Sequence, residues 1–375
     1  MANLLVTGGA GFIGANFVRY WRERNHADTI VVLDSLTYAG NRANLVGVEQ
    51  VFFHHGDIRD EALVRRILAD HAVDTLVHFA AESHVDRSII GPDAFIETNV
   101  LGTHALLKAV KAVWLDAGSG RPHRFHHVST DEVYGSLAPA DPAFTETTRY
   151  APNSPYAASK AASDHLVRAY HHTFGLRVTT SNCSNNYGPY QFPEKLIPLF
   201  LINALHGRPL PIYGDGHQVR DWLHVDDHCQ GIALVLKDGQ LGECYNIGGG
   251  AELANLTVIE TLCAALDRAF AAEPGLAARF PQAPPAHGRT SSSLKTHVAD
   301  RPGHDRRYAI DETRIRTELG YAPARGFAEH FAATLRWYLD NEAWWRGVMD
   351  GSYRDWVEEN YGERRGSAYV YGTST

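Results

Sequence analysis

The chain has 375 residues, of which 44% are hydrophobic and 21% are charged, as in ordinary globular proteins of one large domain or two interlocking ones. Its formal net charge of -8 excludes a general attraction to nucleic acid or anionic lipid, so we expect a small-molecule ligand whose phosphates are bound by local groups. The four cysteines form no Cys-x-x-Cys pair, which argues against a disulfide framework, a thiol redox motif or a structural zinc site and favours a cytoplasmic protein.

Neither a membrane nor a metal ion is expected as a partner. Strand-like residues begin at Leu4 with no basic segment and apolar run before them, and no later stretch is apolar for the length of a membrane span. The 21 histidines include adjacent pairs such as His126 and His127, but neighbours in a strand or a helix point in different directions. We therefore predict surface or core histidines and no metal site.

Apolar β-branched runs alternate with longer amphipathic stretches in the first half of the chain. Strands are predicted at residues 4–7, 30–34, 51–55, 75–79, 125–129 and 178–181. Helices are predicted at residues 11–25, 61–69, 95–115 and 156–174. This alternation predicts an α/β protein with a doubly wound parallel sheet that is covered by helices on both faces.

Beyond about residue 182 the predicted strands are short and turn signals are dense, with helices expected at 195–206 and 225–237. We interpret residues 1–182, with a returning segment near 220–250, as a cofactor-binding domain. Residues 183–345 are then a smaller mixed α/β substrate lobe, and 346–375 a C-terminal extension. The Ala/Pro stretch 271–285, followed by three serines at 291–293, is interpreted as a surface loop.

A glycine-rich turn follows the first predicted strand and opens the first helix. Gly8 permits a tight turn, Gly11 allows close approach of a pyrophosphate, and Gly14 allows the helix to pack closely. About twenty residues later the second strand ends at Asp34, whose carboxylate is suited to the ribose hydroxyls of an adenosine. No Arg follows Asp34 directly. The order of these features is typical of a Rossmann-like domain that binds NAD rather than NADP.

Tyr156 and Lys160 lie four residues apart near the start of a predicted helix, so their side chains share one face. A nearby ammonium stabilises a phenolate, as a base for alcohol oxidation requires. After the fifth strand, Thr130 is suited to bond a reacting hydroxyl, and Asp131 and Glu132 offer an acid and a base where a doubly wound sheet places its ligands. These five residues are our predicted catalytic set.

Taken together, these motifs resemble the dTDP-glucose 4,6-dehydratases, a family of extended short-chain dehydrogenases/reductases, over nearly the whole chain. The resemblance rests on residues 7–14, 80–86, 129–135, 156–160, 183–189, 193–198, 220–222 and 300–305. It implies that Tyr156 takes the proton of the carbon 4 hydroxyl while hydride passes to NAD, and that Glu132 removes the carbon 5 proton. Asp131 then protonates the departing hydroxyl at carbon 6, hydride returns to carbon 6, and NAD is recycled.

The resemblance also implies the binding residues. Those assigned to the cofactor are Gly8, Gly11, Phe12, Ile13, Gly14, Asp34, Ser35, Leu36, Thr37, Asp57, Ile58, Phe79, Ala80, Ala81, Ser83, Thr98, Tyr156, Lys160 and Asn186. Those assigned to the nucleotide sugar are Ser83, Thr130, Asn185, Glu194, Lys195, Leu196, Pro211, Tyr213, Arg220, Asn255, Arg301 and His304. Lys195, Arg220 and Arg301 among them are cations, which the binding of a diphosphate requires. Residues 273–295 match the family poorly.

Several alternatives stay open at this point. A nucleotide-sugar epimerase or decarboxylase shares Thr130, Tyr156 and Lys160 but has no need of the two carboxyl groups, and a non-catalytic NAD-binding protein needs none of the five. The choice between thymidine and uridine depends on a methyl-sized pocket. Helices 95–115 and 156–174 also carry apolar positions that favour a homodimer through a helix bundle. These positions are Val100, Leu106, Ala109, Val113, Ala161, Leu166 and Ala169.

Overall fold

The computed structural model describes residues 2–118, 120, 122–300 and 303–349, and these form two compact units. The first unit comprises the chain up to residue 190 together with 220–252 and 305–330. The second comprises 191–219, 253–304 and the described chain from 331 onward. The division into a cofactor-binding domain and a substrate lobe stays a prediction. Most of the predicted C-terminal extension, residues 346–375, lies outside the described residues.

The first unit is built on a seven-stranded parallel sheet in the order β10-β6-β5-β4-β1-β2-β3. The strands are β1 (Asn3–Thr7), β2 (Thr29–Asp34), β3 (Val51–His55), β4 (Thr75–His78), β5 (Arg124–Thr130), β6 (Val178–Cys183) and β10 (Cys244–Ile247). The strand order reverses between β1 and β4, as in a doubly wound Rossmann-like sheet. The predicted fold class and all six predicted strands are confirmed, whereas β10 was not predicted.

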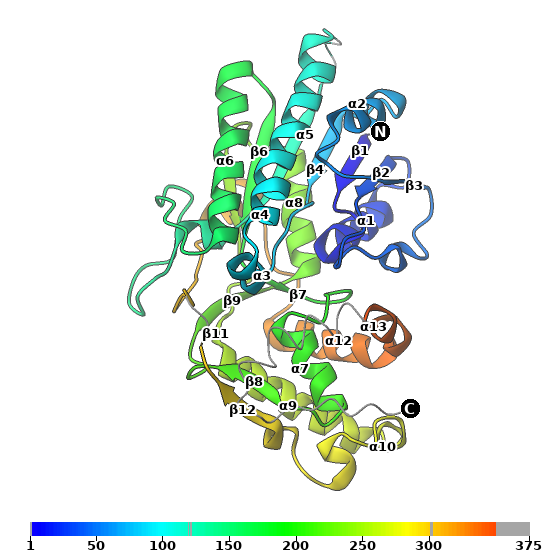
Figure 1. Cartoon of the computed structure of the whole chain (residues 1–375), viewed down its shortest axis with the longest axis vertical. Coiled ribbons are helices and arrows are strands. Elements are labelled where there is room, and N and C mark those ends of the chain that lie inside the picture. Colours follow the sequence, from blue (N-terminus) through cyan, green and yellow to red (C-terminus); the bar gives the residue numbers. More distant parts are fainter. Residues whose placement is uncertain (1, 119, 121, 301–302, 350–375) are drawn as a thin grey trace. The chain divides into compact units, whose positions relative to one another are not determined.

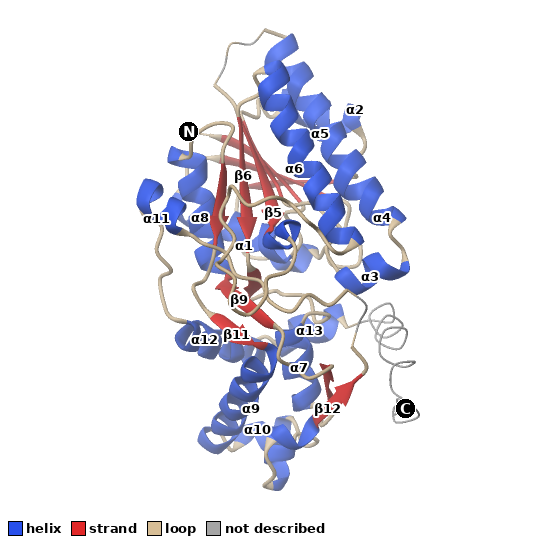
Figure 2. Ribbon diagram, turned by 90° about the vertical axis from the view of Figure 1, so that its left-hand side faces the viewer, coloured by secondary structure: helices blue, strands red, loops and turns tan. Residues whose placement is uncertain are grey.

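Helices cover both faces of this sheet (Figures 1 and 2). On one face, Leu4 and Val6 pack with residues of α1 (Phe12–Arg24), α8 (Val225–Asp238) and α11 (Thr313–Leu319). On the other face, Leu5 packs with residues of α2 (Glu61–Asp70), α5 (Thr103–Val110) and α6 (Pro155–Phe174). Successive residues of β1 therefore belong to opposite cores, because side chains alternate across a strand.

The helix predicted over 95–115 is continuous, but parts of it are wound as π-helix. It consists of α4 (Asp93–Phe95), the π segment η2 (Ile96–Gly102), α5 and the π segment η3 (Lys111–Asp116), and α3 (Val85–Ile90) precedes it. Within η2 the carbonyl oxygen of Asn99 accepts a hydrogen bond from Ser163 Oγ of α6. A side chain that takes a helix carbonyl in this way favours a locally wider turn.

The remaining elements are shorter or lie outside the main sheet. They are the 3-10 helices η1 (Arg42–Leu45) and η4 (Asp131–Tyr134), the sheet of β7 (Asn185–Tyr187), β9 (Val219–His224) and β11 (Glu252–Ala254), the parallel pair β8 (Leu210–Tyr213) and β12 (Lys295–Val298), and the helices α7 (Leu196–Leu205), α9 (Asn255–Ala272), α12 (Phe327–Asp340) and α13 (Glu342–Val348). Among the described residues, no helix is both long and apolar enough to cross a membrane.

The prediction of a surface loop over residues 271–285 and 291–293 is wrong. The segment contains the end of α9, then α10 (Gly275–Arg279), η5 (Pro284–His287) and η6 (Ser291–Leu294). Leu276, Phe280 and Ala283 are buried. Its Ala- and Pro-rich composition resembles a loop, but a few apolar side chains at suitable spacing are enough to fix short helical turns against a neighbouring helix.

The replacement Phe280→Ala tests whether this segment is packed. Phe280 is 2% exposed, so its truncation removes buried apolar surface and leaves a cavity. We expect the free energy of unfolding in urea to fall by about 3–5 kcal/mol. The exposed Arg289→Ala is the control, with an expected change within about 0.5 kcal/mol. Equal effects of the two replacements would contradict the packed segment.

Candidate active site

The turn between β1 and α1 has a backbone that only glycine fits. Gly8 has a φ of +69°, and a Cβ on it would lie 2.6 Å from the backbone nitrogen of Ala80. A Cβ on Gly14 would lie 2.2 Å from the carbonyl oxygen of Gly8. Gly14 thus allows α1 to approach the turn itself, while the Gly8 amide bonds to the Leu33 carbonyl at 2.9 Å. Two of the three predicted glycine roles therefore have a direct steric cause.

The N-terminus of α1 is shaped to accept an anion. Gly11 is its N-cap, no side chain caps it, and the first turn holds no acidic residue. A Cβ on Gly11 would meet only the Gly8 oxygen, at 3.3 Å. The amides of Phe12, Ile13 and Gly14 begin this helix, where backbone N–H groups and the helix dipole favour a diphosphate.

Asp34 ends β2 beside this turn and is buried. Its Oδ2 accepts a hydrogen bond from the Ala10 amide at 2.9 Å, and its Oδ1 accepts one from the Leu36 amide at 2.8 Å. Burial raises the pKa of this carboxyl group, and the two amides act against that rise. A carboxylate oxygen has more than one lone pair, so Asp34 retains acceptor capacity for ribose hydroxyls. Ser35 and Thr37 beside it are exposed.

The other predicted cofactor residues of the first unit follow neighbouring strands. Asp57 and Ile58 come after β3, and the Asp57 carboxylate accepts hydrogen bonds from the Arg59 side chain at 2.7 and 2.9 Å. Phe79, Ala80 and Ala81 come after β4 and are only partly buried. Because the strands are parallel, their carboxyl ends meet at one edge of the sheet. Ser83 follows at this edge and is exposed, and Thr98 lies on η2 and is partly buried.

The predicted catalytic residues come together where β5 ends and α6 begins. Thr130 is the last residue of β5, and its Oγ1 accepts a hydrogen bond from the Glu132 amide at 3.3 Å. Asp131 and Glu132 open η4. Tyr156 and Lys160 lie in the first two turns of α6, whose N-cap Ser154 accepts a hydrogen bond from the Ala157 amide at 3.1 Å.

The electrostatics of Tyr156 show how near these groups are. Burial raises the pKa of its phenol well above the usual value, and the charges of Glu132 and Asp131 add to that rise. A hydrogen bond with Thr130 acts in the opposite direction. The phenol is therefore close enough to Thr130, Asp131 and Glu132 for each to influence its pKa.

The two adjacent carboxyl groups are in different surroundings. Asp131 is 1% exposed, whereas Glu132 is partly exposed. Burial raises the pKa of Asp131 well above its usual value, the charges of Glu132 and Asp221 raise it further, and Arg220 lowers it. Asp131 is thus predisposed to be a protonated acid, because its neighbour's negative charge and the lack of water both oppose its ionisation.

Lys160 is buried against the sheet. Its Nζ donates a hydrogen bond to the Val128 carbonyl of β5 at 2.9 Å. Burial lowers the pKa of this ammonium group, and the charge of Asp164 acts most strongly against that lowering. Asp164 was not predicted as a site residue, although its position one helical turn after Lys160 is a signal that the sequence contained.

Of the predicted substrate residues, the first unit holds Arg220, Asn185 and the already described Thr130 and Ser83. Arg220 is buried, lies over the Tyr308 ring at 4.2 Å, and donates a hydrogen bond to the Asp305 carbonyl at 3.0 Å. Asn186 beside Asn185 on β7 is bonded to His228 at 2.9 Å. Tyr308, whose pKa is raised first by burial and next by the charge of Glu132, was missed because no local pattern links it to β5.

The second unit holds the other predicted substrate residues. Glu194 is buried, Lys195 is the N-cap of α7, and Leu196 is its first residue. The remaining described ones are Pro211 and Tyr213 on β8, Asn255 at the start of α9, and His304, whose ring lies 6.0 Å from that of Tyr213. Arg301 lies outside the described residues.

No group of three or more His, Cys, Asp and Glu side chains within the described ranges is arranged to hold a metal ion. The four cysteines, all of them described, are free thiols.

Comparisons with known proteins agree with this geometry. The family model described as GDP-mannose 4,6 dehydratase matches residues 5–334. A dTDP-glucose 4,6-dehydratase of Xanthomonas campestris is 56% identical, covering 94% of this chain and 98% of the relative. One of Escherichia coli K12 is 50% identical, covering 96% and 99%.

Solved structures give the same result. The crystal structure of a dTDP-glucose 4,6-dehydratase from Streptomyces venezuelae with NAD bound matches with a TM-score of 0.81 and 52% identity, covering 92% of this chain and 99% of that one. A UDP-glucose 4-epimerase from Thermotoga maritima matches with a TM-score of 0.76 at 26% identity, covering 91% and 99%. Since relatives at least half identical are covered over nearly their whole length, the chain belongs to the dTDP-glucose 4,6-dehydratase family of extended short-chain dehydrogenases/reductases.

Proposed function

We propose that the chain is an NAD-dependent hydro-lyase that converts dTDP-glucose to dTDP-4-keto-6-deoxyglucose and water. The observation that carries this proposal is the buried Asp131 beside the half-buried Glu132, in the same pocket as Tyr156 and Lys160. An oxidation alone requires the phenol and the ammonium group. The carboxyl pair adds an acid and a base, which elimination of water requires.

The residues around the first turn fit NAD as the resident cofactor. The uncapped N-terminus of α1 fits the pyrophosphate, and Asp34 fits the adenosine ribose. When bound, NAD would accept the hydride from carbon 4 and return it to carbon 6 after water is lost, while the proton taken by Glu132 would be replaced at carbon 5. Asp34 also excludes a ribose phosphate, because two negative charges would then meet at a buried carboxylate.

Tyr156 acts first, as the base that accepts the proton of the carbon 4 hydroxyl. Lys160 lowers the cost of the phenolate by its positive charge, and Thr130 orients the hydroxyl by a hydrogen bond. The ketone formed at carbon 4 acidifies the neighbouring carbon 5 hydrogen. Elimination therefore becomes feasible only after the oxidation.

Glu132 and Asp131 then divide the elimination between them. Glu132, the more exposed carboxylate, removes the carbon 5 proton, and Asp131, held protonated by burial, gives its proton to the departing carbon 6 hydroxyl. The opposite protonation states follow from the different surroundings of the two groups. A nucleotide-sugar epimerase is the second candidate, since one is similar in fold, but it leaves this pair without a use.

Recognition of the diphosphate nucleoside is proposed for Lys195, Arg220 and Arg301 as cations, with Glu194, Leu196, Pro211, Tyr213, Asn185, Asn255 and His304 around the base and sugars. UDP-glucose is the alternative substrate, because discrimination of a thymine methyl rests on one small pocket. The cytoplasm is the proposed compartment, in keeping with four free thiols.

We further propose a homodimer formed through the helices of the first unit. Leu106, Ala109 and Ala161 are buried within the subunit, so they are unavailable for the interface that the sequence suggested. The exposed apolar residues Ile96 and Leu101 on η2, 47% and 54% exposed, offer a face instead. Apolar side chains exposed together on one helical segment favour association.

Incubation with dTDP-glucose and with UDP-glucose in D₂O tests the reaction and the role of Glu132. The wild-type chain is expected to form a 4-keto-6-deoxy product from dTDP-glucose with deuterium at carbon 5. Glu132→Gln keeps the size but cannot accept the proton, so we expect kcat to fall about 10²–10⁴-fold. Unchanged turnover in this variant, read by mass spectrometry, would refute the mechanism.

Asp131→Asn separates proton removal from elimination. The amide cannot protonate a leaving hydroxyl, so product formation should fall about 10²–10⁴-fold, whereas Glu132 still removes the carbon 5 proton. The recovered dTDP-glucose is then expected to gain deuterium at carbon 5 without losing water. Full product formation by this variant would assign the acid to another group.

Light scattering at micromolar concentration tests the dimer. The wild-type chain is expected at about twice the chain mass, and Leu101→Arg at the chain mass, because a buried unpaired charge opposes association. Val46→Arg, the same kind of replacement at a 72% exposed apolar residue outside these helices, serves as the control and is expected to leave the dimer intact. A monomeric wild-type chain rejects the proposal.

A further inference from the structure

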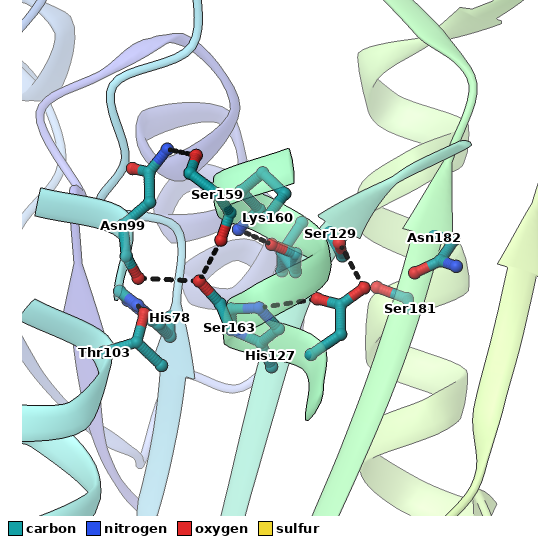
Figure 3. A network of polar contacts seen from close by, with 12 residues as sticks. His78, Asn99, Thr103, His127, Ser129, Ser159, Lys160, Ser163, Ser181 and Asn182 are labelled. Carbon is teal, nitrogen blue, oxygen red and sulfur yellow. Dashed lines mark hydrogen bonds and ion pairs between the residues drawn. The ribbon is translucent and has the colours of Figure 1, made fainter. Parts of the chain in front are cut away.

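A buried polar cluster includes His127 and Ser129 of β5 near Lys160 of α6 (Figure 3), and Asp164 of α6 contacts both β5 residues. The carboxylate Oδ2 accepts hydrogen bonds from Ser129 Oγ at 2.9 Å and from the Tyr150 hydroxyl at 3.0 Å. His127 Nε2 lies 3.0 Å from the other oxygen, Oδ1. His127 and Asp164 are 0% and 6% exposed as residues, so water does not screen this pair.

The cluster joins the elements that carry the proposed active site. His127 and Ser129 are two residues apart on β5, so both point to the side of the sheet that α6 covers. Asp164 follows Lys160 by four residues and lies on the same helix face. Lys160 in turn holds the Val128 carbonyl between those two residues at 2.9 Å. The Asp164 carboxylate thus connects α6 to the C-terminal end of β5, directly before Thr130.

The cluster presents donors to Asp164, which is the arrangement for an anion. The hydroxyl groups of Ser129 and Tyr150 both donate to it. Burial lowers the pKa of His127 well below its usual value, and Lys160 lowers it further, so His127 is neutral. His127 Nε2 lies 3.0 Å from Oδ1 without the geometry of a hydrogen bond, so the two hydroxyl groups are the donors that hold the carboxylate. Tyr150 also accepts a hydrogen bond from Asn182 at 3.2 Å, which fixes its hydroxyl.

We propose that Asp164, held by Ser129 and Tyr150, is a positioning residue whose buried carboxylate keeps Lys160 in its ammonium form for Tyr156. This inference rests on the proposed function. Asp164 does not touch the pocket in which Tyr156 meets the two catalytic carboxyl groups. It acts through Lys160, which stabilises the phenolate during the oxidation at carbon 4.

The alternative, that Asp164 is only a structural hydrogen-bond acceptor, conflicts with its charge. Burial raises the pKa of Asp164 to about 6, and Lys160, Ser129 and Tyr150 act against this rise. Since the folded pKa lies above the ordinary value of 3.8, ionisation of Asp164 lowers the stability of the fold as pH rises from about 4 to about 6, and the loss stays constant above that pH. An uncharged acceptor would avoid that cost, so stability alone gives no reason for a carboxylate here.

Other titratable groups lie near Lys160 and Asp164. His78 of β4, with its ring 5.3 Å from that of His127, and Cys183 of β6 face Lys160, while Tyr134, His165 and Cys244 face Asp164. Burial lowers the pKa of His78 well below its usual value and raises that of Cys183 to about 12. Both are therefore uncharged at neutral pH, and Asp164 is the counter-charge to Lys160.

Asp164→Asn tests the proposal, with Tyr150→Phe as the matched control. The amide oxygen still accepts from Ser129 and Tyr150, and the asparagine keeps the size of the aspartate while removing its charge. Without the negative charge the pKa of Lys160 falls, so the alkaline limb of the kcat profile for dTDP-glucose should move to lower pH by about one unit. We expect kcat at pH 8 to fall roughly tenfold, KM to stay within about twofold and Tm to be unchanged or higher.

Tyr150→Phe removes one hydrogen bond to the same carboxylate but leaves its charge, so its alkaline limb is expected at the wild-type pH. An Asp164→Asn profile with the wild-type alkaline limb overturns the proposal, as does an equal shift in both variants. Wild-type turnover of dTDP-glucose in the same assay tests the proposed function separately. Its absence would reject that function rather than the position of Asp164.

Ser129→Ala keeps the proposal testable if Asp164→Asn does not fold. Loss of this donor makes ionisation of Asp164 harder, so the carboxylate takes up a proton at higher pH. The acid limb of kcat is then expected to move to higher pH, while the alkaline limb stays. An acid limb unchanged in this variant, with thermal stability also unchanged, contradicts the role of Asp164.

Discussion

The structure around the proposed active site depends on a buried ammonium group, that of Lys160. Taking this charge out of water is costly, and the chain offsets the cost with the Val128 carbonyl and the Asp164 carboxylate. In the proposed mechanism this positive charge stabilises a phenolate on Tyr156, which lies one helical turn away on α6. Packing of α6 on β5 is therefore both a structural contact and a condition of the chemistry.

The topology of the main sheet determines where the predicted site residues lie. Parallel strands bring their carboxyl ends to one edge, where the glycine turn after β1, Asp34 after β2 and the Thr130 segment after β5 meet. Gly8 and Gly14 allow the first helix to begin within contact of that turn. The proposed cofactor site and the proposed acid–base site thus both follow from the parallel arrangement of the strands, whose carboxyl ends lie at one edge of the sheet.

The sequence predicted the elements of the main sheet because long strands and helices have strong periodic patterns. It did not predict β10, which has four residues and pairs with a strand about sixty residues earlier, nor the three-residue β7 and β11. It misjudged residues 271–293, where composition suggested a loop and the buried Phe280 fixes short helices. The catalytic set, which stays a prediction, rests on local motifs, whereas Tyr308 comes near Glu132 and Arg220 only through tertiary packing.

The proposed division of the acid and base roles between Asp131 and Glu132 also follows from burial. Adjacent residues of one 3-10 turn necessarily differ in environment, and here Asp131 faces the protein interior while Glu132 reaches partly to solvent. The charge of Glu132 raises the pKa of Asp131, so ionisation of one opposes ionisation of the other. An acid and a base at neighbouring positions therefore need no further residue to distinguish them. A ketone formed first at carbon 4 then makes that pair sufficient, because it supplies the acidity at carbon 5 that no side chain here provides.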